Sequence, residues 1–393
     1  MKTAQLGQIA KINPRLPREL TSQTSRTVHF VPMAELSEQG YVSPNGTRRL
    51  DEVMKGYTYF ENGDVLVAKI TPCMENGKAA LVRGLEHQIA FGSTEFHVLR
   101  PTEEVDAKYL FYMIWNPVFR HQAAIKMTGS AGQKRVPTSF LEQFEIPLPK
   151  LEEQKRIVAI LDKADSIRRK RQESLSHVST LIASRFLEVF GDPVGNPRKW
   201  KLGTFDDQVT LLQYGPRFFN EAYVEADGIR IVRITDLDFQ GRLDYSAMPL
   251  MDVSDEDRQK FVLKPGDLLL ARSGATVGKT ALIDDRAPEC IAGAYFIRMR
   301  FKDAVRPLYV QMVLRSKLVQ QMIASRSQQS AQQNFNGPAI RALPLPVPPI
   351  ELQDQFIQFH AAAISLGERM ATQSGESDAL FNSLVQRAFK GEL

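Results

Sequence analysis

Two long stretches of the chain place apolar residues at steps of three and four, the spacing that keeps side chains on one face of an α-helix. They cover residues 151–190 and 350–389. Each predicts a helix of ~40 residues, or roughly 60 Å at a rise of 1.5 Å per residue. A long helix with a single apolar stripe must bury that stripe against a partner. Because the two helices match in length, we expect them to pair as a coiled coil.

Each stripe continues along the whole of its helix. The face of the first helix comprises Ile157, Ile160, Ala164, Ile167, Arg171, Leu175, Val178, Ile182, Phe186 and Val189. The face of the second comprises Phe356, Phe359, Ala363, Leu366, Met370, Ser374, Ser377, Phe381, Val385 and Ala388. The second helix is weakest over residues 372–377, which are rich in poor helix formers. We therefore expect fraying or a kink there.

The two helices belong to a longer internal repeat. A proline-containing strap, Ile146-Pro147-Leu148-Pro149, precedes the first helix, and Leu345-Pro346-Val347-Pro348 precedes the second. Pro346 follows Pro147 by 199 positions, and Gln353 follows Gln154 by the same number. This period is far longer than the roughly 20–50 residues of a solenoid unit. The sequence therefore predicts two copies of a domain plus a helix, with boundaries at 1–145, 146–192, 193–344 and 345–393.

The residues ahead of each strap have the pattern of a mixed, strand-rich module. Short apolar runs predict strands near residues 28–33, 64–69, 79–82 and 95–99. Residues 108–124 predict a helix that Pro117 ends or kinks. The second copy repeats these apolar runs and glycines, whereas the polar loops at 128–135 and 327–334 differ in residue type. The expected fold class is α+β, with two tandem modules and an antiparallel helix pair.

Connectivity sets the expected direction of the helices. The first helix ends where the second module begins, and the second helix begins where that module ends. A compact module has its two ends close together, so the helices should run antiparallel. We expect a pseudo-two-fold arrangement with one module at each end of the helix pair.

Composition adds a modest constraint on location and partners. Hydrophobic residues make up 43% of the 393 positions, which is enough for real cores, and the formal net charge is +5. This basic balance leans toward an anionic partner such as nucleic acid. The two cysteines occupy non-equivalent positions in the repeat, which is typical of a reducing compartment. No leader-like or membrane-spanning apolar run is evident, so we expect a cytoplasmic protein.

One stretch resembles a phosphate-binding loop. Residues 273–280, Ser-Gly-Ala-Thr-Val-Gly-Lys-Thr, approach the pattern G-x-x-x-x-G-K-[ST] but begin with serine. Residues 281–284 then have the pattern of a strand, whereas the motif requires a helix N-terminus facing the phosphates. Nucleotide hydrolysis at this loop is therefore disfavoured.

Other catalytic chemistry finds little support. The six histidines are scattered and form no cluster with metal-ligand spacing. Ser130 and Ser273 have no base partner that the sequence can assign. Asp64 and Asp267 recur in both copies after glycine, where we expect them to bond the backbone of a turn. The chain is thus expected to be non-catalytic, without a metal site or bound cofactor.

Several of these segments resemble one protein family. The segments IPLPKLEEQKRIVAILDKAD and LPVPPIELQDQF and the closing SLVQRAFKGEL are similar to the conserved regions of specificity subunits of type I restriction–modification enzymes. GDLLLARSGATVGKTALI resembles the core of the target-recognition domains of that family. The resemblance covers essentially the full length. It departs at the second strap, where Leu352 stands at the position of Glu153, and at the glycine- and serine-rich stretch 374–377.

The resemblance implies a division of labour. Each module would be a target-recognition domain that reads one half of a split sequence in double-stranded DNA. The helix pair would set the gap between the halves and dock two adenine-methylating modification subunits and, in the larger complex, restriction subunits. S-adenosylmethionine and ATP would bind to those partner subunits, and the chain itself would have no catalytic role.

Candidate DNA contacts follow from side-chain chemistry. Lys and Arg suit phosphates, Arg suits guanine, and Gln and Asn suit adenine. The candidates in the first module are Lys69, Thr71, Lys78, Gln133, Lys134 and Arg135. Those in the second module are Arg272, Ser273, Thr276, Lys279, Arg326, Gln328, Gln333 and Asn334, with Gln213, Tyr214 and Arg217 as a further loop.

Two other functions remain open at this stage. The chain could be a two-module DNA-binding regulator or scaffold without methyltransferase partners, which the absence of a neighbouring methyltransferase reading frame would favour. It could also be a hydrolase that uses the loop 273–280, in which case nucleotide would raise its melting temperature.

Overall fold

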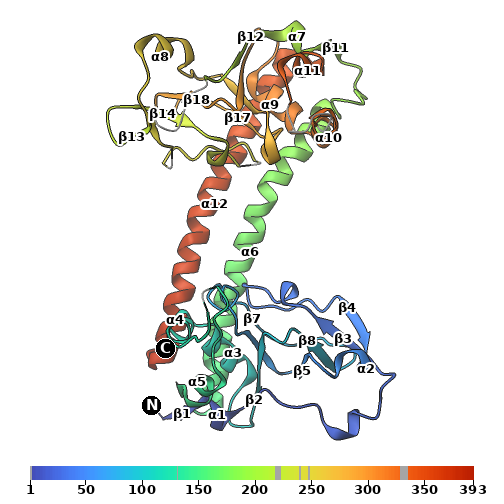
Figure 1. The fold of residues 1–393 in the computed structure, drawn as a ribbon, viewed down its shortest axis with the longest axis vertical. Coiled ribbons are helices and arrows are strands. Elements are labelled where there is room, and N and C mark those ends of the chain that lie inside the picture. Colours follow the sequence, from blue (N-terminus) through green and yellow to red (C-terminus); the bar gives the residue numbers. More distant parts are fainter. Residues whose placement is uncertain (1, 131, 217–222, 239, 247, 328–334) are drawn as a thin grey trace. The chain divides into compact units, whose positions relative to one another are not determined.

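The computed structural model describes residues 2–130, 132–216, 223–238, 240–246, 248–327 and 335–393. The chain divides into two compact units (Figure 1). Unit 1 comprises Met1–Gln172 and Ala371–Leu393, and unit 2 comprises Glu173–Met370. Each long helix therefore contributes one part to each unit. Among the described residues, the helices include none with the length and apolar character needed to cross a bilayer.

Unit 1 alternates short strands with short helices before its first long helix. Its strands are β1 (Thr3–Gln5), β2 (Ala10–Ile12), β3 (Thr27–Val31), β4 (Gly46–Arg49), β5 (Thr58–Glu61), β6 (Val65–Ala68), β7 (Ala79–Leu81), β8 (Ile89–Gly92), β9 (Phe96–Pro101) and β10 (Glu145–Pro147). Its helices are α1 (Leu6–Ile9), η1 (Arg18–Leu20), η2 (Met33–Glu35), α2 (Leu50–Val53), α3 (Ala107–Trp115), α4 (Pro117–Ile125), α5 (Thr138–Gln143) and the start of α6 (Leu151–Phe190).

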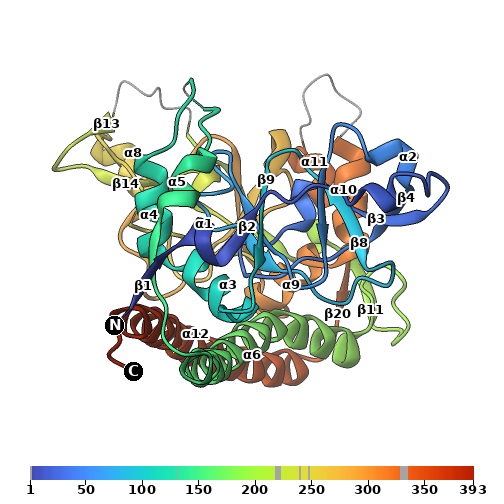
Figure 2. The ribbon, with the colours of Figure 1, turned by 90° about the horizontal axis from the view of Figure 1, so that it is seen from below.

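The strands of unit 1 form two four-stranded sheets and a two-stranded one. The first sheet has the order β2-β9-β6-β7, and the second has the order β4-β3-β8-β5, in which β3 and β8 are parallel. Every residue of β6 is buried. One core lies between the first sheet, α3 and the two long helices, which Figure 2 shows from below. The strap enters this core through β10, which pairs antiparallel with β1.

Unit 2 has a closely related set of elements. Its strands are β11 (Lys201–Thr204), β12 (Val209–Tyr214), β13 (Tyr223–Val224), β14 (Ile229–Val232), β15 (Leu250–Met251), β16 (Leu268–Ala271), β17 (Thr280–Leu282), β18 (Cys290–Ala292), β19 (Phe296–Phe301) and β20 (Pro344–Val347). Its helices are α7 (Phe205–Gln208), η4 (Ile234–Asp236), α8 (Asp255–Phe261), η5 (Gly274–Thr276), α9 (Pro307–Arg315), α10 (Lys317–Ser327), α11 (Gly337–Arg341) and the start of α12 (Ile350–Lys390).

The topology of unit 2 repeats that of unit 1. Among the described residues, β12-β19-β16-β17 corresponds to β2-β9-β6-β7, and the parallel pair β14 and β18 corresponds to β3 and β8. β11 and β20 repeat the pairing of β1 with β10. The predicted α+β class and the duplicated module are confirmed. The main difference is β5, whose place beside β8 is taken in unit 2 by an isolated bridge between Val262 and Ile291.

The helix predicted over 108–124 is broken where Pro117 demands it. α3 ends at Trp115, and α4 begins at Pro117. The Asn116 side chain caps α4 by accepting a hydrogen bond from the Val118 N–H at 2.8 Å. The residue before a proline avoids the helical region, and Asn116 has extended dihedrals accordingly.

A buried glutamine ties each long helix to its module. The Gln154 Oε1 accepts from the Asp106 N–H at 2.8 Å, and its Nε2 donates to the carbonyl oxygens of Glu104 and Pro149. Gln353 repeats the arrangement with the Arg306 N–H and the carbonyls of Ala304 and Pro348. Both side chains are fully buried. Each glutamine therefore satisfies three backbone groups at the start of its helix.

A buried tyrosine adds a second tie in each copy. The Tyr109 hydroxyl donates to the Pro147 carbonyl at 3.0 Å, and the Tyr309 hydroxyl donates to the Pro346 carbonyl at 2.9 Å. Burial raises the pKa of both phenols well above the ordinary value, so they remain protonated donors. Together, the glutamine and the tyrosine bond two carbonyl groups of each strap, those of Pro147 and Pro149 in the first copy and of Pro346 and Pro348 in the second.

The expected break in the second long helix is wrong. α12 continues through Ser374, Gly375 and Ser377, and both serines are buried. The guanidinium of Arg171 donates to the Gln373 carbonyl at 3.0 Å and also to the Ser377 hydroxyl. Low helix propensity is a weak preference that packing overrides. Here the small serines let α6 approach closely enough for this contact.

We predict that Gln154→Ala lowers the free energy of unfolding by about 2–4 kcal/mol, because it leaves one buried N–H and two carbonyls without partners. Gln358→Ala, on the exposed face of α12, is the matched control and should cost under about 0.5 kcal/mol. Urea denaturation followed by circular dichroism measures both. Equal effects of the two substitutions would contradict the role assigned to Gln154.

Candidate nucleic-acid interface

Three segments of unit 1 meet at the end of β6 and bring several predicted DNA contacts together. The Lys69 N–H donates to the Glu95 carbonyl at 2.9 Å, and the Val136 N–H donates to the Lys69 carbonyl at 2.8 Å. The Thr71 N–H donates to the Lys134 carbonyl at 3.0 Å. We call residues 69–71, 93–95 and 133–136 the first platform.

The segment that carries Arg135 is paired on both sides. Arg135 forms antiparallel bridges with Thr128 on one side and Ile70 on the other. The turn between Thr128 and Arg135 requires Gly129, because its φ is +124° and a Cβ there would lie 2.8 Å from the Gln133 carbonyl oxygen. Arg135 therefore projects from a fixed backbone, whereas Gln133 and Lys134 lie exposed at the turn.

Arg135 forms a bidentate ion pair with Glu95. Its Nε lies 3.0 Å from Glu95 Oε2, and its Nη2 lies 2.8 Å from Oε1. The hydrogen bond from Arg135 is the main reason that the pKa of the Glu95 carboxyl is held below its usual value. Sequence reasoning missed Glu95. Its only signal was a charged residue next to the start of a buried strand.

Lys78 belongs to a different place in unit 1. Its backbone carbonyl accepts from the Ala68 N–H, but its Nζ donates to the Met33 carbonyl at 3.2 Å. The side chain thus braces the 33–36 turn. Its predicted contact with DNA stays a prediction.

Unit 2 reproduces the same backbone scheme with different side chains. The Arg272 N–H donates to the Tyr295 carbonyl at 2.9 Å, and the Phe335 N–H donates to the Arg272 carbonyl at 2.7 Å. Arg272, Tyr295 and Phe335 therefore occupy the backbone places of Lys69, Glu95 and Val136. We call residues 271–273, 293–295 and 335 the second platform. Lys279 repeats Lys78, since its Nζ donates to the Leu237 carbonyl at 2.8 Å.

The second platform is aromatic where the first is charged. The Arg272 guanidinium lies 5.0 Å from the centre of the Tyr214 ring, a distance typical of a cation–π contact. The Tyr214 hydroxyl accepts from the Gly337 N–H at 2.8 Å. Tyr295 is 57% exposed. A cation, a stacked ring and an exposed ring suit contact with phosphates and bases.

The remaining candidates of unit 2 lie in varied settings. Gln213 and Tyr214 were expected in a loop, but they belong to β12, where Gln213 accepts from Arg298 at 3.2 Å. The Thr276 hydroxyl donates to the Ser273 carbonyl at 3.2 Å. Arg326 is exposed near the end of α10. Arg217, Gln328, Gln333 and Asn334 lie outside the described residues.

The loop that resembles a phosphate-binding motif has the wrong geometry for it. Residues 274–276 form a 3-10 turn, and Thr280 begins strand β17 instead of a helix. The helix N-terminus that would face phosphates is therefore missing from the described stretch after the loop. Across the described residues, no group of three or more His, Cys, Asp or Glu side chains could hold a metal ion.

Asp64 and Asp267 bond the backbone, as predicted, and also hold arginine side chains. Asp64 accepts from the Glu61 N–H, and Asp267 accepts from the Lys264 N–H. Arg100 donates twice to Asp64 at 2.8 Å, and Arg300 donates to Asp267 at 2.5 Å. These aspartates are almost fully buried. They are structural supports of β6 and β16 and are not available to a ligand.

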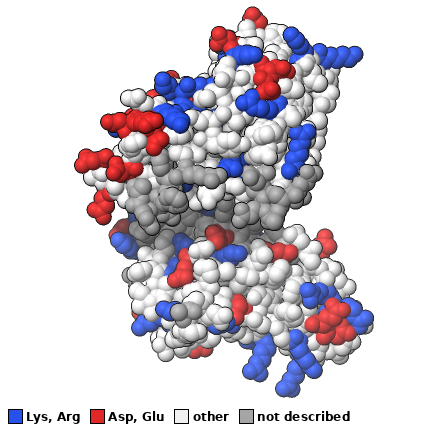
Figure 3. Space-filling model, turned by 45° about the horizontal axis from the view of Figure 1, so that its top comes forward, with Lys and Arg blue, Asp and Glu red and all other residues white. Residues whose placement is uncertain are grey.

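Charges of both signs occur on the face that Figure 3 draws. On the face drawn in Figure 3, Lys and Arg stand among Asp and Glu and do not form one continuous cationic area.

In unit 1, the buried line of α6 matches the predicted one only in part. After Gln154, the buried positions of α6 in unit 1 are Ile157, Leu161, Asp165 and Arg168. Ile160 and Ala164 are half-buried, and Ile167 is 44% exposed. The prediction assumed that only apolar residues face inward, whereas the buried face of α6 also includes the ion pair of Asp165 and Arg168.

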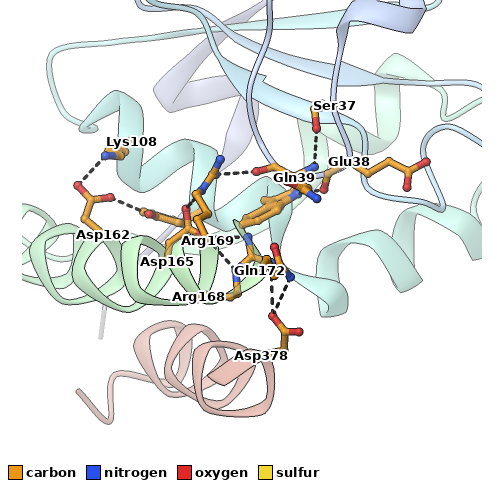
Figure 4. Close-up of polar contacts among 12 residues, drawn as sticks. Ser37, Glu38, Gln39, Lys108, Asp162, Asp165, Arg168, Arg169, Gln172 and Asp378 are labelled. Carbon is orange, nitrogen blue, oxygen red and sulfur yellow. Dashed lines mark hydrogen bonds and ion pairs between the residues drawn. The ribbon is translucent and has the colours of Figure 1, made fainter. Parts of the chain in front are cut away.

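That ion pair joins α6 to α12 and to the module (Figure 4). Arg168 lies 2.7 Å from Asp165 and 3.6 Å from Asp378, and its guanidinium is 5.3 Å from the centre of the Phe381 ring. The neighbouring Arg169 donates to the Gln39 carbonyl at 2.6 Å. The network thus links the turn around residue 39 to both long helices.

A second polar contact in the same view fixes α3 on α6. Lys108 lies 2.6 Å from one carboxylate oxygen of Asp162, and the Tyr112 hydroxyl donates to the other at 2.6 Å. Burial, together with the bond to Asp162, raises the pKa of Tyr112. The phenol therefore remains a donor at neutral pH.

Most of the other residues of the predicted helix face are buried in, or pack against, the cores of the two units. In unit 1, Phe381, Val385 and Ala388 are buried in the core with Ile157. In unit 2, Phe186 lies 5.6 Å ring to ring from Phe356, with Ile182 and Ala363 buried in the same core. Val178 and Phe359 pack against this core, Leu175 and Met370 are half-buried, and Leu366 is 43% exposed.

Gly367, and not Leu366, faces α6. A Cβ on Gly367 would lie 3.4 Å from Val178, so Gly367 occupies the position facing α6. The pairs Val178–Gly367 and Phe186–Phe356 in unit 2 run in opposite sequence directions, as do Arg156–Leu393 and Arg171–Ser377 in unit 1. The antiparallel pairing of the helices is thus confirmed within each unit.

Comparison with known proteins gives a consistent result. The family model described as type I restriction modification DNA specificity domain matches residues 1–177 and 197–360. The specificity subunit of the type I restriction enzyme EcoAI from Escherichia coli is 44% identical over 155 residues, which is 39% of this chain and 26% of that protein. The EcoEI specificity subunit from the same organism is 42% identical over 160 residues, or 40% and 26% of the two chains. The chain thus spans about a quarter of the length of these curated relatives.

Solved structures share the fold. A chain from a study of complex assembly and conformational transition of the type I R-M system covers 100% of this chain and 98% of its own length, with a TM-score of 0.66 and 21% identity. The S subunit of a type I restriction–modification system from M. genitalium has a TM-score of 0.51 and 13% identity, with 99% of this chain and 96% of that one covered.

We predict that Arg168→Ala lowers the free energy of unfolding by about 2–3 kcal/mol, because it removes a main partner of the buried Asp165 carboxylate. The adjacent Ile167→Ala is the control, and its cost should stay within about 0.5 kcal/mol because the side chain is exposed. Chemical denaturation of both variants tests the order. A larger loss of stability for Ile167→Ala than for Arg168→Ala would indicate that Ile167 faces inward, as the sequence predicted.

Proposed function

The chain belongs to the family of type I restriction modification DNA specificity domains, and we propose that it is the sequence-reading, non-catalytic subunit of a complex that modifies DNA. The family model matches twice, once over each module. Each module would read one half of a split target in double-stranded DNA. The enzymatic steps would belong to separate chains.

The observation that carries this proposal is the repeated platform. In the described part of each unit, two corresponding main-chain hydrogen bonds join the end of the buried strand to two neighbouring segments, and the side chains at these places differ. Sequence is read by side chains that meet base edges, while backbone and phosphate contacts only place the protein on the duplex. A common backbone with distinct side chains is what two readers of two different half-sequences require.

The two platforms also offer suitable chemistry. The first presents Arg135, Lys134 and Gln133, and the second presents Arg272 over the Tyr214 ring together with the exposed Tyr295. Arginine and glutamine bond the major-groove edges of guanine and adenine, respectively, and lysine neutralises phosphate.

We further propose that the helix pair docks the partner chains. Several large apolar side chains of α6 and α12 stay exposed, including Leu181, Leu366 and Leu380 at 50%, 43% and 60%. Exposed apolar side chains on a helix surface are typical of a binding face when they cluster. The partners would be two methyltransferase subunits that bind S-adenosylmethionine and, in the full complex, restriction subunits that use ATP.

A domain exchange tests the proposal. Residues 1–145 are replaced by the corresponding module of a family member with another target, and the variant is assembled with its modification subunits. We expect one half of the methylated sequence to change and the other half and the gap to stay, because each module reads alone. Mapping of methylated adenines on plasmid DNA provides the measurement.

The reciprocal exchange of residues 193–344 is the matched control and should alter only the other half. A change in both halves from either exchange would contradict the assignment of one half-sequence to each module. Specific DNA binding without any association with modification subunits would instead favour the reading as a regulator or scaffold.

A further inference from the structure

The two platforms differ at the place held by Glu95 in unit 1 and Tyr295 in unit 2. We propose that Arg135, positioned by Glu95, reads a guanine in the half-target of unit 1, an inference that rests on the proposed function. Arg135 is the base-contacting residue, and Glu95 is a positioning residue. Unit 2 has no carboxylate at the corresponding backbone place, so this contact belongs to one half-target only.

The backbone of Arg135 is unusually well fixed for a residue beside a surface turn. Its N–H donates to the Thr128 carbonyl at 2.8 Å, and the Thr128 N–H donates back at 3.0 Å. On the other edge, Ile70 pairs with it between the bonds of Lys69 and Thr71 to their neighbours. A side chain on such a base loses little freedom on binding, which favours a directional contact.

The guanidinium is also oriented. Glu95 engages Nε and Nη2, and the Gln133 carbonyl accepts from Nη1 at 3.0 Å. Arginine has five N–H donors, so within the described part of the chain these three contacts leave two, one on each Nη nitrogen. Two donors side by side match the O6 and N7 acceptors of guanine in the major groove. The Arg135 side chain is 41% exposed, so these donors can reach a ligand.

The carboxylate argues against a phosphate contact. Glu95 stays ionised, because the hydrogen bond from Arg135 holds the pKa of its carboxyl below the usual range. An arginine neutralised by a bidentate carboxylate attracts phosphate weakly, because phosphate binding depends on net positive charge. The carboxylate leaves the direction of the remaining donors intact. Lys134 is exposed at the turn, and its compact ammonium charge suits a phosphate.

Unit 2 replaces the charged pair with aromatic chemistry. Tyr295 projects 57% exposed from the backbone place of Glu95, and Phe335 takes that of Val136. The residue at the sequence position equivalent to Arg135 is Asn334, which lies outside the described residues. The second half-target is therefore read through different groups.

The test uses the chain assembled with its modification subunits and a library of duplexes in which each target position is randomised. In Arg135→Ala, we expect preference for guanine at one position of one half to fall by roughly 5- to 100-fold, with the other half unchanged. Arg135→Lys should lose most of the same preference, since an ammonium keeps the charge but lacks the planar fork. Glu95→Gln should weaken it at the same position.

Lys134→Ala is the matched control from the same platform. It should weaken binding to all sequences alike and reduce the salt dependence, as removal of a phosphate contact does. If Arg135→Ala behaves like Lys134→Ala, or if Arg135→Lys keeps full guanine preference, Arg135 contacts phosphate and the inference is wrong. If the Arg135 variants leave a clear split target unaltered, the inference fails while the proposed function stands. A wild-type complex without any sequence preference would overturn both.

Discussion

The structure depends on one buried hydrogen-bonding side chain used twice. Gln154 and Gln353 each sit at the first turn of a long helix and bind an N–H and two carbonyls from a module and its strap. An amide offers one acceptor and two donors, which is the set needed there. Because an unsatisfied buried backbone group costs about 1–3 kcal/mol, any sliding of the helix past its module is penalised. The module is thus held in one orientation on its own helix.

The backbone of each platform is rigid as well. The platform backbones are fixed by main-chain hydrogen bonds from the end of β6 or β16 to two neighbouring segments. Under the proposed function, the base-contacting groups would have to be held within about 0.5 Å of the productive place. Lys69 and Arg272 show how the scaffold achieves this, since each is bracketed by two main-chain bonds while its side chain differs from its counterpart. The fold thus sets the position of each side chain, and the type of side chain sets which groups it can bind.

The sequence allowed the coarse plan to be predicted, but not the fine packing of charged groups. The repeat was visible because Pro147 and Gln154 recur with an identical spacing, and the break at Pro117 follows from backbone sterics alone. The buried line of α6 was misplaced between Ile160 and Ile167 because apolar residues were assumed to face inward. Arg168 is buried instead because Asp165 and the Phe381 ring compensate it, and such compensation depends on contacts across the fold. Glu95 was missed for the same reason.

The way the platforms are fastened has a consequence for how such a protein can diversify. Their segments are joined through N–H and C=O groups that every residue except proline possesses. Exchanging a side chain such as that of Glu95 or Tyr295 therefore leaves the fastening in place. New preferences can accumulate by single substitutions without passing through unfolded ancestors, and two copies in one chain can drift apart independently. If each module reads DNA as proposed, a change in one half-target would need no change in the other module or in the main-chain bonds that hold the platforms.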